Sequence, residues 1–176
     1  MSSHTTLRIA ALAAAAALAI AGCGGGGSKS QTAPQRSPAV AASVPDLHSL
    51  ESSLGHVIYW AGARAHYTYE LTQTRGGNVY VRYLPAGVKV GDSRPNFLTI
   101  GTYPQPRAFE QVQAAARRKG ARKTRLPHGG LVVQNASRPT SVYLAYPNSS
   151  LLVEVFDPSA AAARTLVRSG QIRPLR

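Results

Sequence analysis

The sequence contains one cysteine, Cys23, among its 176 residues. A single thiol cannot form a disulfide within the chain, and no cysteine follows residue 23 that could bind a metal as thiolate. A domain that follows Cys23 must therefore depend on its hydrophobic core for stability.

Common catalytic patterns are also absent. The sequence has no Gly-x-Ser-x-Gly, Ser-x-x-Lys or His-Glu-x-x-His spacing, the patterns that present a nucleophile or hold a zinc ion. The glycine run 24–27 precedes no strand-helix unit, so it does not predict a phosphate-binding loop. The histidines are dispersed, whereas a metal site needs three or four converging ligands. We therefore expect no metal and no cofactor, and we assign no catalytic residue.

A hydrophobic run long enough to span a membrane is lacking too. Residues 9–22 are apolar, mostly Ala and Leu, and follow a polar start that carries Arg8. As a helix, this run would be about 21 Å long, whereas the hydrocarbon core of a bilayer is about 30 Å thick. It therefore fits a signal peptide over residues 1–22 rather than a permanent membrane span.

The run ends in Ile20-Ala21-Gly22-Cys23. This sequence resembles the lipobox of bacterial lipoproteins, with Ile20 where Leu is commonest. The resemblance implies that the Cys23 thiol receives a diacylglyceryl group and that the chain is cleaved before Cys23. The protein would then be lipid-anchored on the extracytoplasmic face of the cell membrane. The alternative is an ordinary secretory signal with an incidental cysteine.

Composition divides the rest of the chain in two. Gly, Ser, Ala and Pro dominate residues 24–45 without apolar periodicity, so residues 23–45 are expected to be the lipidated cysteine and a flexible tether. A tether of this length has a root-mean-square reach of about 25 Å. Residues 46–176 have a length typical of one domain.

This domain is predicted to be α+β, with one mostly antiparallel sheet and two main helices on one face. A short helix is expected over residues 46–54, with Asp46 as its N-cap and Gly55 after its end. The main helices are expected to begin near Pro106 and at Asp157-Pro158, where Asp157 would be the N-cap. Strands are expected at residues 56–60, 67–72, 79–83, 97–103, 122–126, 131–135, 141–146 and 151–156.

Short motifs recur along the domain. Gly76-Gly77, Ser93-Arg94-Pro95 and Tyr103-Pro104 are followed later by Gly129-Gly130, Ser137-Arg138-Pro139 and Tyr146-Pro147. Either the motifs recur by chance, or the domain consists of two related units of hairpin, strand and helix.

Acidic residues are scarce, since 20 Lys and Arg stand against 7 Asp and Glu. Three of the basic residues precede Asp46, so the domain keeps an excess of ten positive charges. Six basic residues lie within nine positions, and they favour binding to anionic lipid or an anionic wall polymer over nucleic acid. The alternative is a solvated helix end. The six are Arg117, Arg118, Lys119, Arg122, Lys123 and Arg125.

The aromatic residues lie mainly in predicted strands, where core and cross-strand packing is their simplest role. Tyr80 and Tyr143 are out of phase with the apolar face of their strands, so they are the candidates for contact with a small ligand. Glu70 alternates with threonines and is expected to face solvent. His56, His66 and Glu70 would form a hydrolase-like acid–base site only if their strands were neighbours.

Segments 58–62, 69–72, 79–85, 93–95 and 153–158 are similar to those of uncharacterised lipoproteins from high-GC actinobacteria. The resemblance implies a location and brings no activity with it. Our first hypothesis is therefore a membrane-anchored, non-enzymatic binding or interaction module of the cell envelope. The alternatives are a tethered hydrolase and a small-ligand binder with a tyrosine-lined pocket. No protein partner is indicated.

Overall fold

A computed structural model of the chain describes residues 36–176. The predicted signal peptide, Cys23 and most of the predicted tether lie outside these residues. Residues 36–176 belong to one compact unit with its own hydrophobic core, so we expect the segment 32–176 to fold without the residues before it. None of the helices between residues 36 and 176 has the length and apolar character needed to cross a bilayer.

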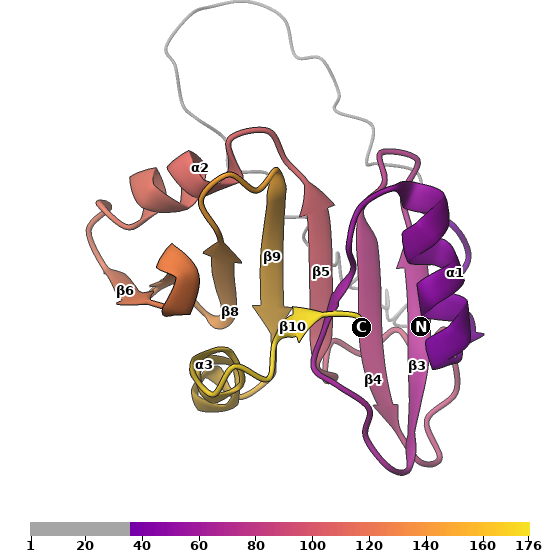
Figure 1. Ribbon diagram of the computed structural model, residues 1–176. Coiled ribbons are helices and arrows are strands. Elements are labelled where there is room, and N and C mark those ends of the chain that lie inside the picture. Colours follow the sequence, from indigo (N-terminus) through magenta and orange to yellow (C-terminus); the bar gives the residue numbers. More distant parts are fainter. Residues whose placement is uncertain (1–35) are drawn as a thin grey trace, which may run out of the picture. The chain divides into compact units, whose positions relative to one another are not determined.

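The fold is α+β, as predicted, and is built on an eight-stranded antiparallel sheet (Figure 1). The strand order is β1-β3-β4-β5-β9-β8-β7-β6, and β2 and β10 form a separate two-stranded ribbon. The elements in chain order are β1 Val40–Ala42, α1 Val44–Leu54, β2 Tyr59–Trp60, β3 Tyr67–Gln73, β4 Val79–Pro85, β5 Thr99–Pro104, α2 Ala108–Ala115, β6 Ala121–Arg125, the 3-10 turn η1 Pro127–Gly129, β7 Leu131–Asn135, β8 Arg138–Ala145, β9 Leu151–Phe156, α3 Ala160–Arg168 and β10 Arg173–Pro174.

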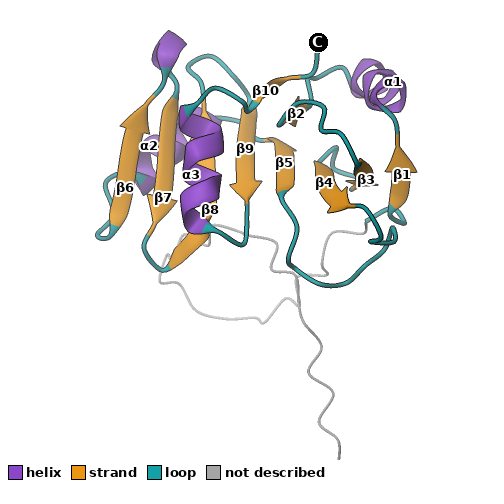
Figure 2. Ribbon diagram, turned by 90° about the horizontal axis from the view of Figure 1, so that it is seen from below, coloured by secondary structure: helices purple, strands orange, loops and turns teal. Residues whose placement is uncertain are grey.

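The two main helices lie on opposite faces of the sheet, so the prediction that they share one face is wrong. Leu166 and Val167 of α3 belong to the same core cluster as Leu144. Val112 of α2 belongs to a second cluster with Ala145. Since neighbouring residues of a strand point to opposite faces, α2 and α3 pack on different sides of β8. Figure 2 shows α3 in front of this part of the sheet and α2 behind it.

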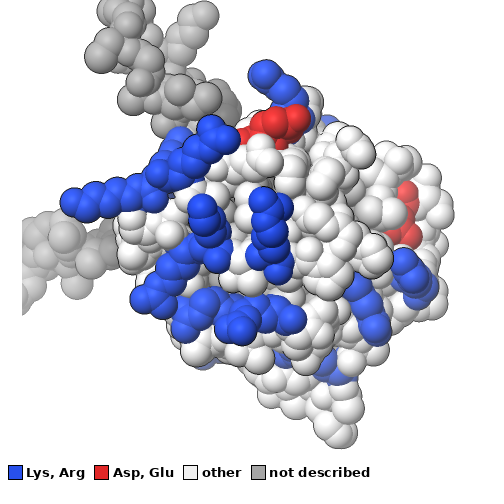
Figure 3. Space-filling model, turned by 60° about the vertical axis from the view of Figure 1, so that its left-hand side comes forward, with Lys and Arg blue, Asp and Glu red and all other residues white. Residues whose placement is uncertain are grey.

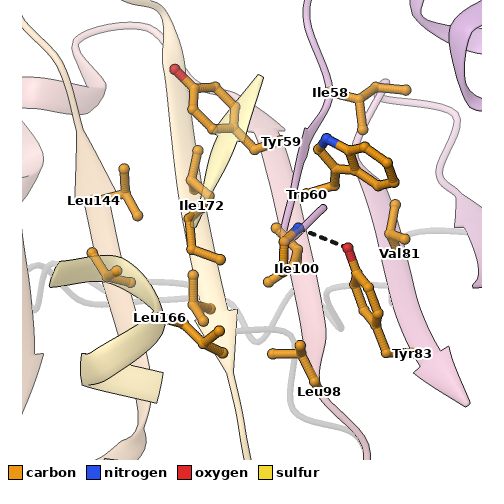
Figure 4. Close-up of a cluster of buried hydrophobic side chains, with 14 of the residues drawn as sticks. Ile58, Tyr59, Trp60, Val81, Tyr83, Leu98, Ile100, Leu144, Leu166 and Ile172 are labelled. Atoms are coloured by element: carbon orange, nitrogen blue, oxygen red, sulfur yellow. Dashed lines mark hydrogen bonds between the residues drawn. The ribbon is translucent and has the colours of Figure 1, made fainter. Parts of the chain in front are cut away.

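The larger core lies on the α3 face, where the β2–β10 ribbon and α1 also cover the sheet (Figure 1). Figure 4 shows Tyr59 and Trp60 of the ribbon in the same cluster as Tyr83 of β4 and Ile100 of β5. The buried Tyr83 hydroxyl accepts a hydrogen bond from Ala61 N at 2.7 Å and donates to the Gly62 carbonyl at 3.2 Å. The expected core role of these aromatics is therefore confirmed.

The fold begins before residue 46, inside the segment whose composition suggested a tether. Val40, Ala41 and Ala42 pair with β3, and Ser43 rather than Asp46 is the N-cap of α1. Asp46 stands three residues further on, and its carboxylate accepts from Ser43 N at 2.8 Å while Asp46 N donates to the Ser43 hydroxyl at 3.2 Å. This reciprocal capping box explains why the helix begins earlier than the Asp46 signal suggested.

The same displacement occurs at α3, whose N-cap is Ser159 instead of Asp157. Asp157 accepts from Ser159 N at 2.8 Å and so shapes the turn before the helix. Gly55 follows α1 with a left-handed φ of 68°, as its predicted role requires.

The sheet consists of two four-stranded halves that meet where β5 pairs with β9. The recurring sequence motifs do not mark equivalent places in these halves. Tyr103-Pro104 ends β5, which directly precedes α2, whereas Tyr146-Pro147 follows β8 and β9 still comes before α3. The recurrence of these motifs therefore gives no structural support for a duplicated unit.

Candidate functional site

The six clustered cations lie along one edge of the sheet. β6 is the terminal strand of the sheet and holds Arg122, Lys123 and Arg125, while Arg117, Arg118 and Lys119 occupy the turn that joins α2 to β6. All six are exposed. Figure 3 shows Lys and Arg side chains gathered on this side of the molecule. We call these six residues the basic edge.

The backbone of the basic edge is held by hydrogen bonds on both sides of the turn. Arg118 N donates to Ala115 O at 3.1 Å, and Ala121 N donates to Arg118 O at 3.1 Å. Gly120, with φ of 79°, accepts from Ala136 N at 3.0 Å. The cations therefore project from a fixed turn and a paired strand.

No residue of the basic edge forms a salt bridge within residues 36–176. Several of the seven carboxylates are engaged elsewhere: Glu70 and Asp92 pair with arginines outside the edge, and Glu154 accepts from tyrosines. The positive charge of the edge is thus not neutralised by the described part of the chain. It is available to an external anion.

Tyr80 and Tyr143 lie in one row of residues across the sheet. The register pairs Tyr80 with Gly101, Gly101 with Glu154, and Glu154 with Tyr143. Tyr103 lies over Gly101, which has no side chain to occupy that space. The Tyr80 and Tyr103 ring centroids are 5.6 Å apart in an edge-on arrangement.

Two hydroxyls in this row are hydrogen-bonded to the same carboxylate. Tyr103 donates to Glu154 Oε2 at 2.6 Å and Tyr143 donates to Glu154 Oε1 at 2.9 Å. Burial, and next the carboxylate charge of Glu154, raise the pKa of both phenols well above its usual range. The row therefore links β5, β9 and β8, and the Tyr143 hydroxyl proton is already donated to Glu154.

The three residues considered for acid–base catalysis are not brought together. His66 immediately precedes β3, whereas His56 Nε2 lies 3.2 Å from the Gly77 carbonyl, in the turn after β3. The seven residues of β3 separate these two places by about 20 Å. Glu70 is only 1% exposed, so the expectation that it faces solvent is wrong.

Glu70 is buried because the loop between β4 and β5 folds back over it. Its carboxylate forms an ion pair with Arg82 and accepts from the backbone amide of Gly91. Arg82 also donates to the carbonyls of Asp92 and Arg94, at 3.0 Å each. Sequence reasoning missed this pair, although Glu70 and Arg82 stand on adjacent strands of a predicted hairpin.

A second ion pair lies at the surface of the same loop. Hydrogen bonds from Arg94 lower the pKa of Asp92 to about 2, so the Asp92 carboxylate is ionised at neutral pH. The two pairs link this loop to β3 and β4, and they account for the charge of Glu70, Arg82, Asp92 and Arg94.

Within residues 36–176, no group of three His, Cys, Asp or Glu residues is placed to hold a metal ion. Comparisons of the chain with known protein families, curated proteins and solved structures give no match. A functional proposal must therefore come from the residues themselves, and the basic edge is the feature that most directly suggests a partner.

Proposed function

We propose that this protein is a lipid-anchored, extracytoplasmic binding module whose basic edge contacts the anionic headgroups of its own membrane. The observation that carries the proposal is the gathering of six exposed cations without carboxylate partners on one edge of the sheet. The lipid anchor is supported by the sequence Ile20-Ala21-Gly22-Cys23, which would place the domain beside such a surface.

The energetics favour a contact that is significant but reversible. Each Lys or Arg near an anionic bilayer contributes about 1 kcal/mol, so six contribute about 6 kcal/mol before screening. The contribution falls with salt because the screening length is about 10 Å at 0.1 M ionic strength. Such a contact cannot replace two acyl chains as an anchor, but it can hold a tethered domain against the surface.

The competing explanation assigns these charges to protection of the sheet edge. Lysines and arginines on a terminal strand discourage pairing with another chain, and β6 is such a strand. This explanation accounts for Arg122, Lys123 and Arg125. It does not account for Arg117, Arg118 and Lys119, which precede the strand.

Vesicle sedimentation of the segment 32–176 tests the proposal, because this segment carries the basic edge without the apolar N-terminal run. We expect it to pellet with phosphatidylglycerol-containing vesicles at low salt and to be released at high salt. The variant Arg117→Glu/Arg118→Glu/Lys119→Glu loses three favourable charges, so its affinity should fall by about 100-fold or more.

A matched variant separates location from net charge. Arg75, Lys89 and Arg168 are exposed and lie away from the basic edge, so Arg75→Glu/Lys89→Glu/Arg168→Glu changes the net charge equally. We expect it to retain most of the binding. The proposal fails if the segment does not pellet at low salt, if the two triple variants bind equally, or if soluble polyphosphate binds the edge while vesicles do not.

A further inference from the structure

We propose that the domain lies on the bilayer with its α2 face, the side of the sheet that α2 covers, toward the membrane. The opposite face, which carries α1 and α3, then points away from the membrane. This orientation rests on the proposed membrane contact of the basic edge and specifies how that contact is made. It follows from how strand geometry distributes the cations between the two faces of the sheet.

Successive side chains of β6 point to opposite faces of the sheet, and two of its three cations lie on the α2 face. Lys123 pairs with Val133 and Arg125 pairs with Leu131, and both of these partners belong to the core cluster under α2. Arg122 pairs with Gln134, whose side chain bonds to Arg164 of α3 at 3.1 Å. Arg122 is therefore on the α3 face.

The other three cations are attached to the α2 layer. Arg117, Arg118 and Lys119 follow Ala116, the C-cap of α2, and Arg117 N still donates to Ala114 O of the helix at 3.2 Å. Five of the six cations thus belong to the α2 side of the edge.

A further cation lies on the same face at the opposite edge of the sheet. The Arg36 guanidinium stands over the Tyr80 ring, 4.9 Å from its centroid, and Tyr80 belongs to the cross-sheet row with Glu154 and Tyr143. Tyr143 packs against the cluster under α2, which places the whole row on the α2 face. This face therefore has cations at both edges.

The carboxylates are distributed in a compatible way. On the α2 face, Glu110 is exposed and Glu154 is engaged by two tyrosines. The register places Glu70 on this face as well, and there Glu70 and Asp92 are each paired with an arginine. The opposite face carries α1 with Asp46 and Glu51. It also carries Arg164 and Arg168 of α3, Arg173 of the ribbon, and Arg64, which stands over the Tyr83 ring. These cations are spread over the face, and Arg164 is bonded to Gln134.

The chain leading to the anchor permits this orientation. Eight strands at about 4.8 Å spacing make a sheet about 34 Å wide, with β1 at one edge and β6 at the other. As the flexible tether that composition predicts, residues 23–35 would have a root-mean-square reach of about 20 Å. With the α2 face downward, both edges lie beside the bilayer, so the lipid on Cys23 and the basic edge can act together.

Two exposed alanines allow the orientation to be measured. Ala114 lies on α2 and Ala161 on α3, and the segment 32–176 contains no cysteine. Ala114→Cys and Ala161→Cys therefore each provide one labelling site for a fluorophore. On phosphatidylglycerol vesicles that carry a headgroup quencher, we expect the Ala114→Cys label to lose its fluorescence and the Ala161→Cys label to keep it.

The outcomes separate the orientation from the membrane contact itself. If the labelled segments bind vesicles but Ala161→Cys is quenched equally or more strongly, the orientation is wrong and the contact stands. If neither segment binds at low salt, both proposals fall. Lys123→Glu/Arg125→Glu should also weaken binding more than Arg122→Glu paired with Arg168→Glu, and equal effects would contradict the α2-face assignment.

Discussion

The two ion pairs at the loop between β4 and β5 differ in burial, and burial determines how much each contributes to stability. Glu70 is 1% exposed and its partner Arg82 is 20% exposed, whereas Arg94 of the neighbouring pair is 60% exposed. Removing one member of a buried pair leaves the other charge without compensation in a poorly solvated place. An exposed pair is hydrated before and after such a change.

We therefore expect Arg82→Ala to lower the free energy of unfolding by about 3 kcal/mol or more. Arg94→Ala, in the loop that covers this pair, should have a free energy of unfolding close to that of the unsubstituted protein. Urea unfolding of the segment 32–176, followed by far-UV circular dichroism, measures both. Equal destabilisation by the two variants would show that the loop does not depend on the buried pair.

The burial of Glu70 also shows where sequence patterns stop being informative at the residue scale. Thr68, Glu70 and Thr72 alternate with Tyr69 and Leu71, and the alternation correctly separates the two faces of β3. It cannot show that a loop 20 residues later covers the polar face. That depends on Arg82 reaching the carbonyls of Asp92 and Arg94.

At the scale of secondary-structure elements, the pairing of β5 with β9 is critical, because it alone connects the two four-stranded halves of the sheet. The Tyr103 ring fills the place that a side chain at Gly101 would take, and from there its hydroxyl reaches Glu154 of β9. A Cβ atom at Gly101 would lie 2.7 Å from the Tyr103 Cζ atom. The absence of a side chain at residue 101 is therefore what permits the Tyr103–Glu154 bond.

Gly101→Ala should displace Tyr103 and destabilise the domain by about 1–3 kcal/mol through overpacking and loss of the hydrogen bond. Gly76→Ala is the matched control, since its nearest neighbour would be 3.9 Å away. Thermal unfolding of both variants gives the comparison. A Gly101→Ala domain as stable as Gly76→Ala would mean that Tyr103 has another position of equal energy.

Local signals predicted most elements but not their assembly. The turn at Gly76-Gly77 and the apolar alternation around it identified the β3–β4 hairpin correctly. The pairing of β5 with β9 joins segments about 50 residues apart, and no turn sequence connects them. The faces covered by α2 and α3 depend on this pairing, which is why both helices were expected on one side.

On the scale of the whole molecule, two attachments to the membrane are proposed: the lipid on Cys23 and the basic edge. The parts of the fold that lead to them lie at opposite ends of the strand order. The N-terminal arm enters through β1 and the cations stand on β6. Composition predicted the basic segment residue by residue, and its exposure is confirmed. Its place opposite β1 could not be predicted, because it depends on the order of all eight strands.

The proposed lipid anchor should hold the protein more strongly than the basic edge, and the variant Cys23→Ala tests the anchor alone. Each buried methylene contributes about 0.8 kcal/mol, so two acyl chains hold a protein stably whereas the basic edge is screened by salt. We expect a clickable fatty acid to label the unsubstituted protein and the Arg117→Glu/Arg118→Glu/Lys119→Glu variant in cells, but not Cys23→Ala. Membranes washed with high salt should retain the first two proteins and release cleaved Cys23→Ala. An uncleaved leader also holds a chain in the membrane, so the label decides the outcome: a Cys23→Ala protein that still incorporates the fatty acid would contradict lipidation at Cys23.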